Sequence, residues 1–219
     1  MGQYYCVGDT ISDSWINALI GGATFGSMLA LGVVWGPRFL AAGGMEQSDA
    51  FNVSAMMWFG LAFGAPIFAW VSDKLKKRRL PMAAGCFLQL LAIIYIISNP
   101  SMSVQGASIA FFIWGFMSAG SMLNFPIGAE LVKPGLIGTS AALVNAVQFI
   151  IGGILMAIPG QVLSGSGPIA RLAHINPEQL NLEPTISDYQ WAISVIPLAL
   201  IGALQLFVFL RETYKEQSA

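Results

Sequence analysis

Charged residues are scarce in this chain of 219 residues, because Asp, Glu, Lys and Arg together make up only 10% of it. Soluble domains usually contain about 25%. None of the four types occurs between Leu80 and Ala129, nor in the stretches 50–72, 134–170 and 189–210. Apolar residues account for 56% of the chain. This lack of charge excludes an ordinary soluble domain and indicates a membrane protein.

Cysteine and histidine are also rare. The two cysteines, Cys6 and Cys86, are too few for a framework of disulfides. His174 is the single histidine, which excludes a histidine metal cluster and a proton shuttle between two histidines. The uncharged stretches also contain no acid–base pair that could serve catalysis. The sequence therefore predicts neither an enzyme nor a bound cofactor.

The apolar runs are long enough to cross a bilayer. A helix needs about 20 apolar residues to span a hydrocarbon layer of about 30 Å, whereas a barrel strand is a shorter segment of alternating polarity. Because these runs are continuous, we predict an all-α membrane protein with six transmembrane helices in contact with lipid. The helices are expected at residues 14–39, 50–71, 80–97, 104–131, 136–160 and 188–210.

Lysine and arginine predict the orientation of these helices. With six spans both chain ends lie on one side, and only Arg38 and Arg171 fall on the other. Since cytoplasmic loops carry an excess of Lys and Arg, segments 1–13 and 212–219 are expected in the cytoplasm, flanking a bundle at 14–211 in an inner or plasma membrane. The net charge of −1 gives no indication of a nucleic-acid partner. The cations on the expected cytoplasmic side are Lys74, Lys76, Lys77, Arg78, Arg79, Lys133, Arg211 and Lys215.

The most specific motif is the turn between the second and third predicted helices. Its core is Ser-Asp-Lys-Leu at 72–75, followed by Arg78 and Arg79, and the small residue Ala69 stands four positions before Asp73. This pattern resembles the signature loop of the major facilitator superfamily. Ala69 and Lys76 stand where that family usually has glycine.

Other segments support the same resemblance. Glu130 is similar to the acidic end of the family's fourth helix, and Leu-Arg-Glu-Thr at 210–213 resembles its usual C-terminal ending. Trp-Gly-Pro at 35–37 and Gly-Ala-Pro at 64–66 look most like the C-terminal half of organic-anion permeases. The resemblance extends over nearly the whole chain.

This resemblance implies a fold and a function. The chain would be half of a major facilitator fold, with a three-plus-three inverted repeat, and would move a small polar solute, an organic anion, by alternating access. The missing half would be an N-terminal six-helix unit or a second copy of this chain. The alternative is a non-transporting membrane scaffold or partner-binding protein. Because no carboxylate or histidine lies deep within the spans, any coupling group is expected elsewhere.

The resemblance also implies a conformational lock at Asp73, Lys77, Arg78, Arg79 and Glu130. Asp73 ends a predicted helix, where the helix dipole disfavours an anion, so a partner is expected beside it. In the family, the Asp contacts the opposite half of the transporter and the acidic residue of the fourth helix pairs with the basic loop. The alternatives are a solvated turn that only sets topology and a solvated interfacial carboxylate.

Polar and aromatic residues recur on single faces of the predicted helices. In the family the first and fourth helices of each half line the central cavity, so such residues are candidate substrate contacts. Two amides three positions apart on the fifth helix are expected to face that cavity together. The alternatives are hydrogen bonding between packed helices, favoured for the hydroxyls, and snorkelling for the single arginine. The candidate contacts are Asn17, Thr24, Arg38, Trp58, Trp114, Ser118, Asn145 and Gln148.

Overall fold

The computed structural model describes residues 7–172 and 184–214, so Cys6 and His174 lie outside the described residues. The described chain forms helices joined by turns and contains no strand. Six helical segments are long and apolar enough to cross a membrane, which confirms that prediction, and the chain is an integral membrane protein. The spans are Ile11–Ala42, Gln47–Leu75, Arg79–Ser98, Val104–Leu131, Pro134–Ser164 and Ile186–Leu206. Their bounds differ from the predicted ones by four residues at most, as at 75 against 71.

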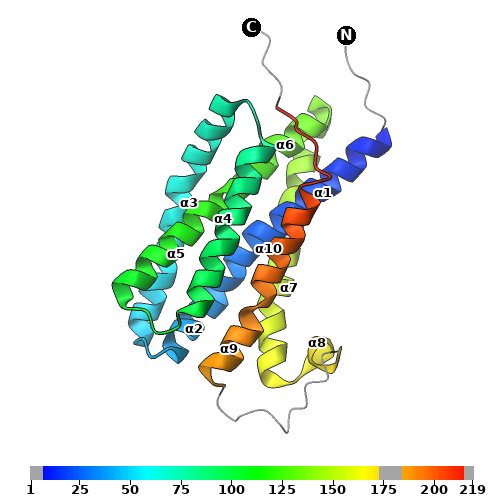
Figure 1. Ribbon diagram of the computed structural model, residues 1–219. Helices are drawn as coiled ribbons and strands as arrows, with labels where there is room; N and C mark the ends of the chain where they lie inside the picture. Colours follow the sequence, from blue (N-terminus) through cyan, green and yellow to red (C-terminus); the bar gives the residue numbers. More distant parts are fainter. Residues whose placement is uncertain (1–6, 173–183, 215–219) are drawn as a thin grey trace.

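The first and fourth spans are interrupted, whereas the second and third are single helices (Figure 1). The first span contains α1 (Val7–Leu29), the π-helix η1 (Ala30–Trp35) and α2 (Gly36–Ala42). The fourth contains α5 (Val104–Ser118), the 3-10 helix η2 (Ala119–Leu123) and α6 (Asn124–Leu131). Pro37 and Pro126 follow the two irregular turns, and neither has an N–H to continue the helical ladder.

The remaining elements end at residues suited to helix termini. Lys76, with φ 52°, ends the helix before it in the left-handed region, and Gly165, with φ 61°, does the same further along. The Thr185 hydroxyl accepts a hydrogen bond from the Asp188 N–H at the start of another helix. These elements are α3 (Gln47–Leu75), α4 (Arg79–Ser98), η3 (Pro134–Leu136), α7 (Ile137–Ser164), α8 (Gly167–Leu172), α9 (Ile186–Ile193) and α10 (Val195–Leu206).

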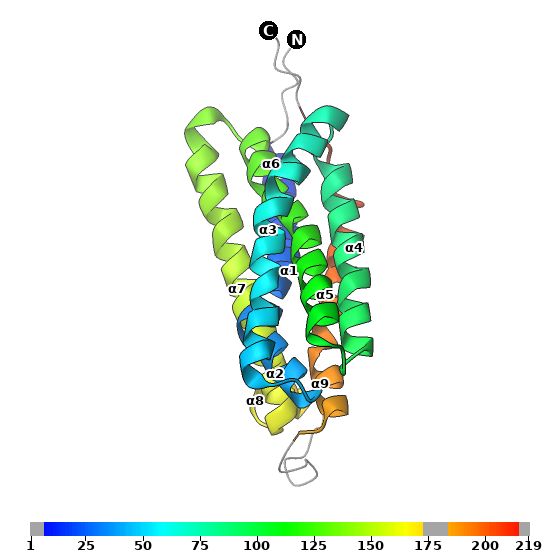
Figure 2. The ribbon, with the colours of Figure 1, turned by 90° about the vertical axis from the view of Figure 1, so that its left-hand side faces the viewer.

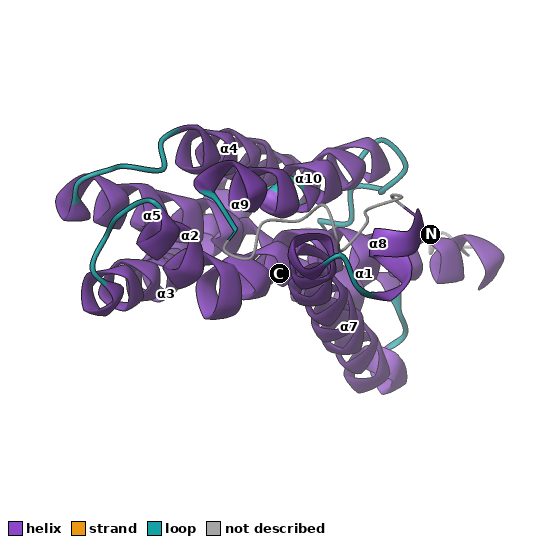
Figure 3. Ribbon diagram, turned by 90° about the horizontal axis from the view of Figure 1, so that it is seen from below, coloured by secondary structure: helices purple, strands orange, loops and turns teal. Residues whose placement is uncertain are grey.

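The helices run roughly along one axis, and both described chain ends lie at the same end of the bundle as the α3–α4 turn (Figures 1 and 2). Seen along that axis, α4 and α10 lie on one side, and α3 and α7 lie on the other (Figure 3). The first span is the central one. Within the bundle, 78% of its most apolar 18-residue segment is buried, against 28% of the corresponding segment of the span that contains α7. Its helix α1 packs on α6, α7 and α10.

Two helix crossings are closed by glycines. At the α1–α7 crossing, a Cβ on Gly26 would lie 2.8 Å from the backbone N of Gly152. At the α3–α5 crossing, a Cβ on Gly60 would lie 2.7 Å from the N of Phe116, and one on Gly115 would overlap the Met57 carbonyl. Small residues let membrane helices approach this closely and gain packing.

Large apolar side chains cover the outside of the bundle. Examples are Phe63 on α3, Leu91 on α4 and Ile150 on α7, all of which are exposed in this chain. In water such a surface would be unfavourable, whereas in a bilayer it contacts acyl chains. The exposed apolar belt therefore fits direct contact with lipid.

Candidate functional site

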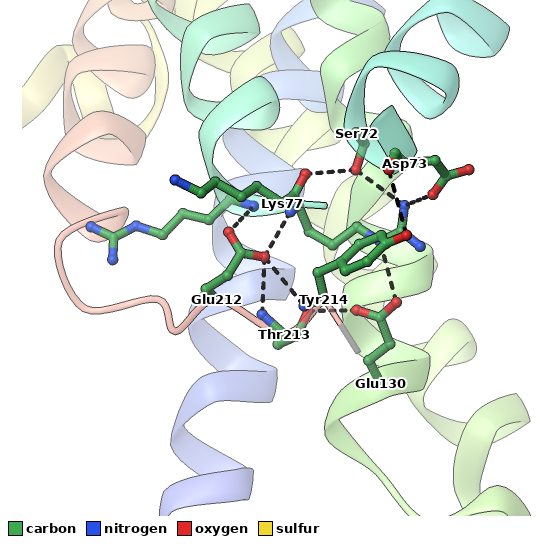
Figure 4. A network of polar contacts seen from close by, with 9 residues as sticks. Ser72, Asp73, Lys77, Glu130, Glu212, Thr213 and Tyr214 are labelled. Carbon is green, nitrogen blue, oxygen red and sulfur yellow. Dashed lines mark hydrogen bonds and ion pairs between the residues drawn. The ribbon is translucent and has the colours of Figure 1, made fainter. Parts of the chain in front are cut away.

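A network of polar contacts joins four segments at the end of the bundle that holds the α3–α4 turn (Figure 4). Hydrogen bonds between residues of the α3–α4 turn hold the turn together. The Ser72 hydroxyl donates to the Lys77 carbonyl at 2.8 Å, and the Lys77 N–H donates back to the Ser72 carbonyl at 3.1 Å. The left-handed Lys76 between them reverses the chain. This closure holds the following residue, Arg78, in a defined position.

Arg78 is the centre of the network. Its Nη1 lies 2.6 Å from Asp73 Oδ1 and donates to the Ser72 hydroxyl at 3.1 Å. Its Nε lies 3.2 Å from Glu130 Oε1. One guanidinium thus connects the end of α3 with the end of α6, using the several donors that arginine presents in fixed directions.

The segment after α10 completes the network. The Glu212 carboxylate accepts hydrogen bonds from the N–H groups of Arg78 at 2.7 Å and Arg79 at 3.2 Å, which are at the start of α4. A carboxylate is favoured there by the unpaired N–H groups and the helix dipole. Thr213 donates its hydroxyl to Glu130 Oε2 at 2.7 Å. The Tyr214 ring lies 4.8 Å from the Arg78 guanidinium, in cation–π geometry.

Two opposing effects act on the pKa of Arg78. Partial burial lowers it, whereas the hydrogen bond to Asp73 and the charge of Glu130 raise it more, so that the pKa lies above its ordinary value. A cation whose pKa rises on folding stabilises the folded state at every pH below its unfolded pKa and loses that effect only at more alkaline pH. Arg78 therefore remains charged across the physiological range.

The five predicted lock residues enter the network in different ways. The Arg78 side chain contacts the side chains of both Asp73 and Glu130. Lys77 and Arg79 contribute backbone groups, because their carbonyl and N–H, respectively, make the contacts described above. Of the two arginines in the basic loop, Arg78 is the one whose side chain pairs with Glu130.

A second ion pair lies at the same end of the bundle. Asp13 Oδ2 is 3.2 Å from Arg211 Nε, and Asp13 is only 5% exposed. The sequence analysis assigned residues 1–13 to a terminal segment outside the spans, but Asp13 belongs to α1 and to the first span. A carboxylate therefore does lie within the end of a span, and its pairing with Arg211 offsets the cost of burial.

The eight candidate substrate contacts do not form one site in this structure. Five of them are enclosed between helices: Asn17, Thr24, Trp114, Ser118 and Gln148. Thr24 and Ser118 donate their hydroxyls to carbonyls of their own helices, as in the alternative favoured for hydroxyls. Trp114 donates Nε1 to the carbonyl of Gln89 at 3.0 Å. These contacts are between helices or within one helix.

The other three candidates are exposed and lie apart. Arg38 stacks on Trp35 with 5.2 Å between the guanidinium carbon and the ring centre, and Trp58 is 38% exposed. Asn145 is exposed whereas Gln148 is 1% exposed, so the two amides have different surroundings in this chain. The face of α7 that packs on other helices therefore includes Gln148 but not Asn145. That both amides face a cavity between two halves stays a prediction.

One apolar groove of the described chain lies away from these candidates. A groove of about 560 Å³ lies between α4 and α5, and its lining is apolar apart from Tyr95. None of the eight candidate contacts lines it. Among the described residues no group of three His, Cys, Asp or Glu side chains is arranged to hold a metal ion.

No protein-family model matches this chain, and no curated protein is similar to it. The function must therefore be argued from the residues and their geometry.

Several polar residues in this geometry were missed by the sequence analysis. Gln89 and Asn124 are buried amides on apolar spans, and amides at such positions are a recognisable signal. Glu212 and Thr213 belong to the Leu-Arg-Glu-Thr ending noted in the sequence, but neither they nor Tyr214 were predicted to join the lock. Their contacts depend on how the chain end folds back.

Proposed function

We propose that this chain is one six-helix half of a secondary transporter of the major facilitator type. It would move a small polar solute, an organic anion, by alternating access. The observation that carries the proposal is the pattern of helix packing, which supports a correspondence between the first three spans and the last three. Inverted repeats of three helices are characteristic of such halves.

The repeated pattern is supported by two pairs of contacts. If the first span corresponds to the fourth and the second to the fifth, the packing of α1 on α7 corresponds to that of α5 on α3. These are the two most extensive contacts between helices of the described chain. Likewise, the packing of α1 on α10 corresponds to that of α5 on α4.

The details of the crossings support the same correspondence. Gly26 and Gly152 close one crossing, and Gly115 and Gly60 lie at the other. The interruptions η1 and η2 fall in the first and fourth spans, which correspond to each other. Discontinuous helices near the middle of the membrane commonly form the binding sites of secondary transporters.

The Arg78 network then acts as a lock on one conformation. It fastens α3, α6, the start of α4 and the segment after α10 at one end of the bundle. These contacts all lie within one half, and the Asp73 side chain, which is 61% exposed, would complete the lock by contacting the opposite half. The exposed faces of α3 and α7 would receive the other half, either an N-terminal six-helix unit or a second copy.

Transport by reconstituted protein tests the proposal. We expect proteoliposomes containing this chain, alone or with its N-terminal half, to take up small mono- or dicarboxylates faster than empty liposomes. Asp73→Asn should change the uptake rate several-fold because it weakens the lock, whereas Asp49→Asn, at the opposite end of α3, should not. Absence of uptake in both assemblies would favour the non-transporting scaffold.

Orientation is a separate prediction. If cations in short loops set topology, Lys76 faces the cytoplasm and Ser166 faces outside. In a background with Cys6 and Cys86 replaced by serine, Ser166→Cys should react with an impermeant maleimide on intact cells, and Lys76→Cys only after lysis. The reverse labelling pattern would invert the orientation.

A further inference from the structure

Three buried amides gather where α1, α6 and α7 meet. Asn17 and Asn124 are 0% exposed and Gln148 is 1% exposed. Asn17 Nδ2 donates to the backbone carbonyl of Asn124 at 2.9 Å, and Asn124 Nδ2 donates to the backbone carbonyl of Ser121 at 2.7 Å. A Cβ on Gly21 would lie 2.7 Å from Asn124 Nδ2 and 3.1 Å from Gln148 Nε2, so these two amides flank the same point of α1.

Each amide also has one buried polar atom without a partner among the protein's described groups. These atoms are Asn17 Oδ1, Asn124 Oδ1 and Gln148 Nε2. Unsatisfied polar atoms are costly in a membrane interior. Three of them on three helices at one junction, out of six such atoms in the described chain, indicate a common ligand.

The chemistry of these atoms selects the ligand. Two are acceptors and one is a donor. A metal cation would satisfy the two oxygens but would be repelled by the Gln148 N–H that faces the same junction. A water molecule can donate to both oxygens and accept from the Gln148 amide. Three hydrogen bonds are typical of a buried water.

We propose that the α1–α6–α7 junction is a binding site for one ordered water molecule, held by Asn17 Oδ1, Asn124 Oδ1 and Gln148 Nε2. The site adjoins η2, the interruption of the fourth span, which ends at Leu123 directly before Asn124. A bridging water can shift its hydrogen bonds more easily than two amides in direct contact. The junction is thus a joint at which α6 can move relative to α1 and α7 while its polar groups stay satisfied. This inference does not depend on transport.

A structure of the chain in lipid nanodiscs, at a resolution that reveals water, tests the site directly. We expect a density peak at about 2.7–3.2 Å from the three named atoms. A peak at about 2.4 Å from the oxygens, with unfolding that depends on sodium, would show a cation and overturn the proposal. Direct pairing of the amides without such a peak would also overturn it.

Substitutions give an independent readout. Gln148→Met keeps the size of the side chain but removes its donor, so the peak should disappear and the midpoint of thermal unfolding should fall by about 2–4 °C. Asn145→Met, on the exposed side of the same helix, is the matched control and should change neither. A peak that persists unchanged in Gln148→Met would contradict the assignment of that amide.

Discussion

Gly115→Ala is expected to lower the free energy of unfolding by about 3 kcal/mol, which is at the upper end of the usual cost of overpacking. The added methyl would overlap the carbonyl of Met57, and its nearest neighbours are backbone atoms of α3 that no side-chain rotation can move. Relief therefore requires α3 and α5 to separate along a contact that is among the most extensive in the bundle.

Gly153→Ala is the matched control for this prediction. Gly153 lies within α7, and a Cβ there has nothing within 4 Å. The change should be neutral or stabilising by up to about 1 kcal/mol, because alanine favours the helix over glycine. Unfolding in mixed micelles, followed by circular dichroism, measures both variants. Equal effects at the two positions would contradict the α3–α5 crossing described above.

Arg78→Ala is expected to cost about 2 kcal/mol of unfolding free energy, since it removes hydrogen bonds to two charged partners. Loss of the contact with Glu130 should account for more of this free-energy cost than loss of the contact with Asp73. The Glu130 side chain is only 20% exposed, whereas that of Asp73 is 61% exposed, so solvent screens the contact with Asp73 more strongly. Glu130→Ala should therefore destabilise the protein more than Asp73→Ala.

Lys133→Ala serves as the control for loss of a cation at the same end of the bundle. Lys133 is exposed and lies between the fourth and fifth spans, so its removal should change stability by less than about 0.5 kcal/mol. The four variants can be compared by thermal unfolding in detergent. If Arg78→Ala and Lys133→Ala behaved alike, the network would contribute no more to stability than an ordinary solvated turn.

The predicted lock residues illustrate what sequence reasoning can and cannot reach. The resemblance of the turn to a family signature loop pointed to Asp73, Arg78 and Arg79, and the resemblance of the end of the fourth span added Glu130. The choice of Arg78 over its neighbour depends on the left-handed Lys76 and on the hydrogen bonds between Ser72 and Lys77. Those features set the direction in which each side chain leaves the turn.

The two amides of α7 also show what cannot be predicted from the sequence alone. A spacing of three residues places Asn145 and Gln148 about 60° apart on the helix, so both could share a face. Which of the two is buried depends on the rotation of α7 about its own axis, and packing on α1 sets that rotation. Gln148 is therefore enclosed beside Asn124 while Asn145 is exposed.

The sequence by itself determined the class of protein and the place of each span. Apolar length and the scarcity of charge are enough for this, because a backbone in lipid must satisfy its hydrogen bonds within a helix. The partners of the polar residues were decided only by the tertiary structure. Glu212 caps α4 from 133 residues away along the chain, and Asn17 meets Asn124 across 107 residues. Many polar residues of the chain could chemically form such hydrogen bonds. Which of them do so depends on which residues the packing of the helices brings close together.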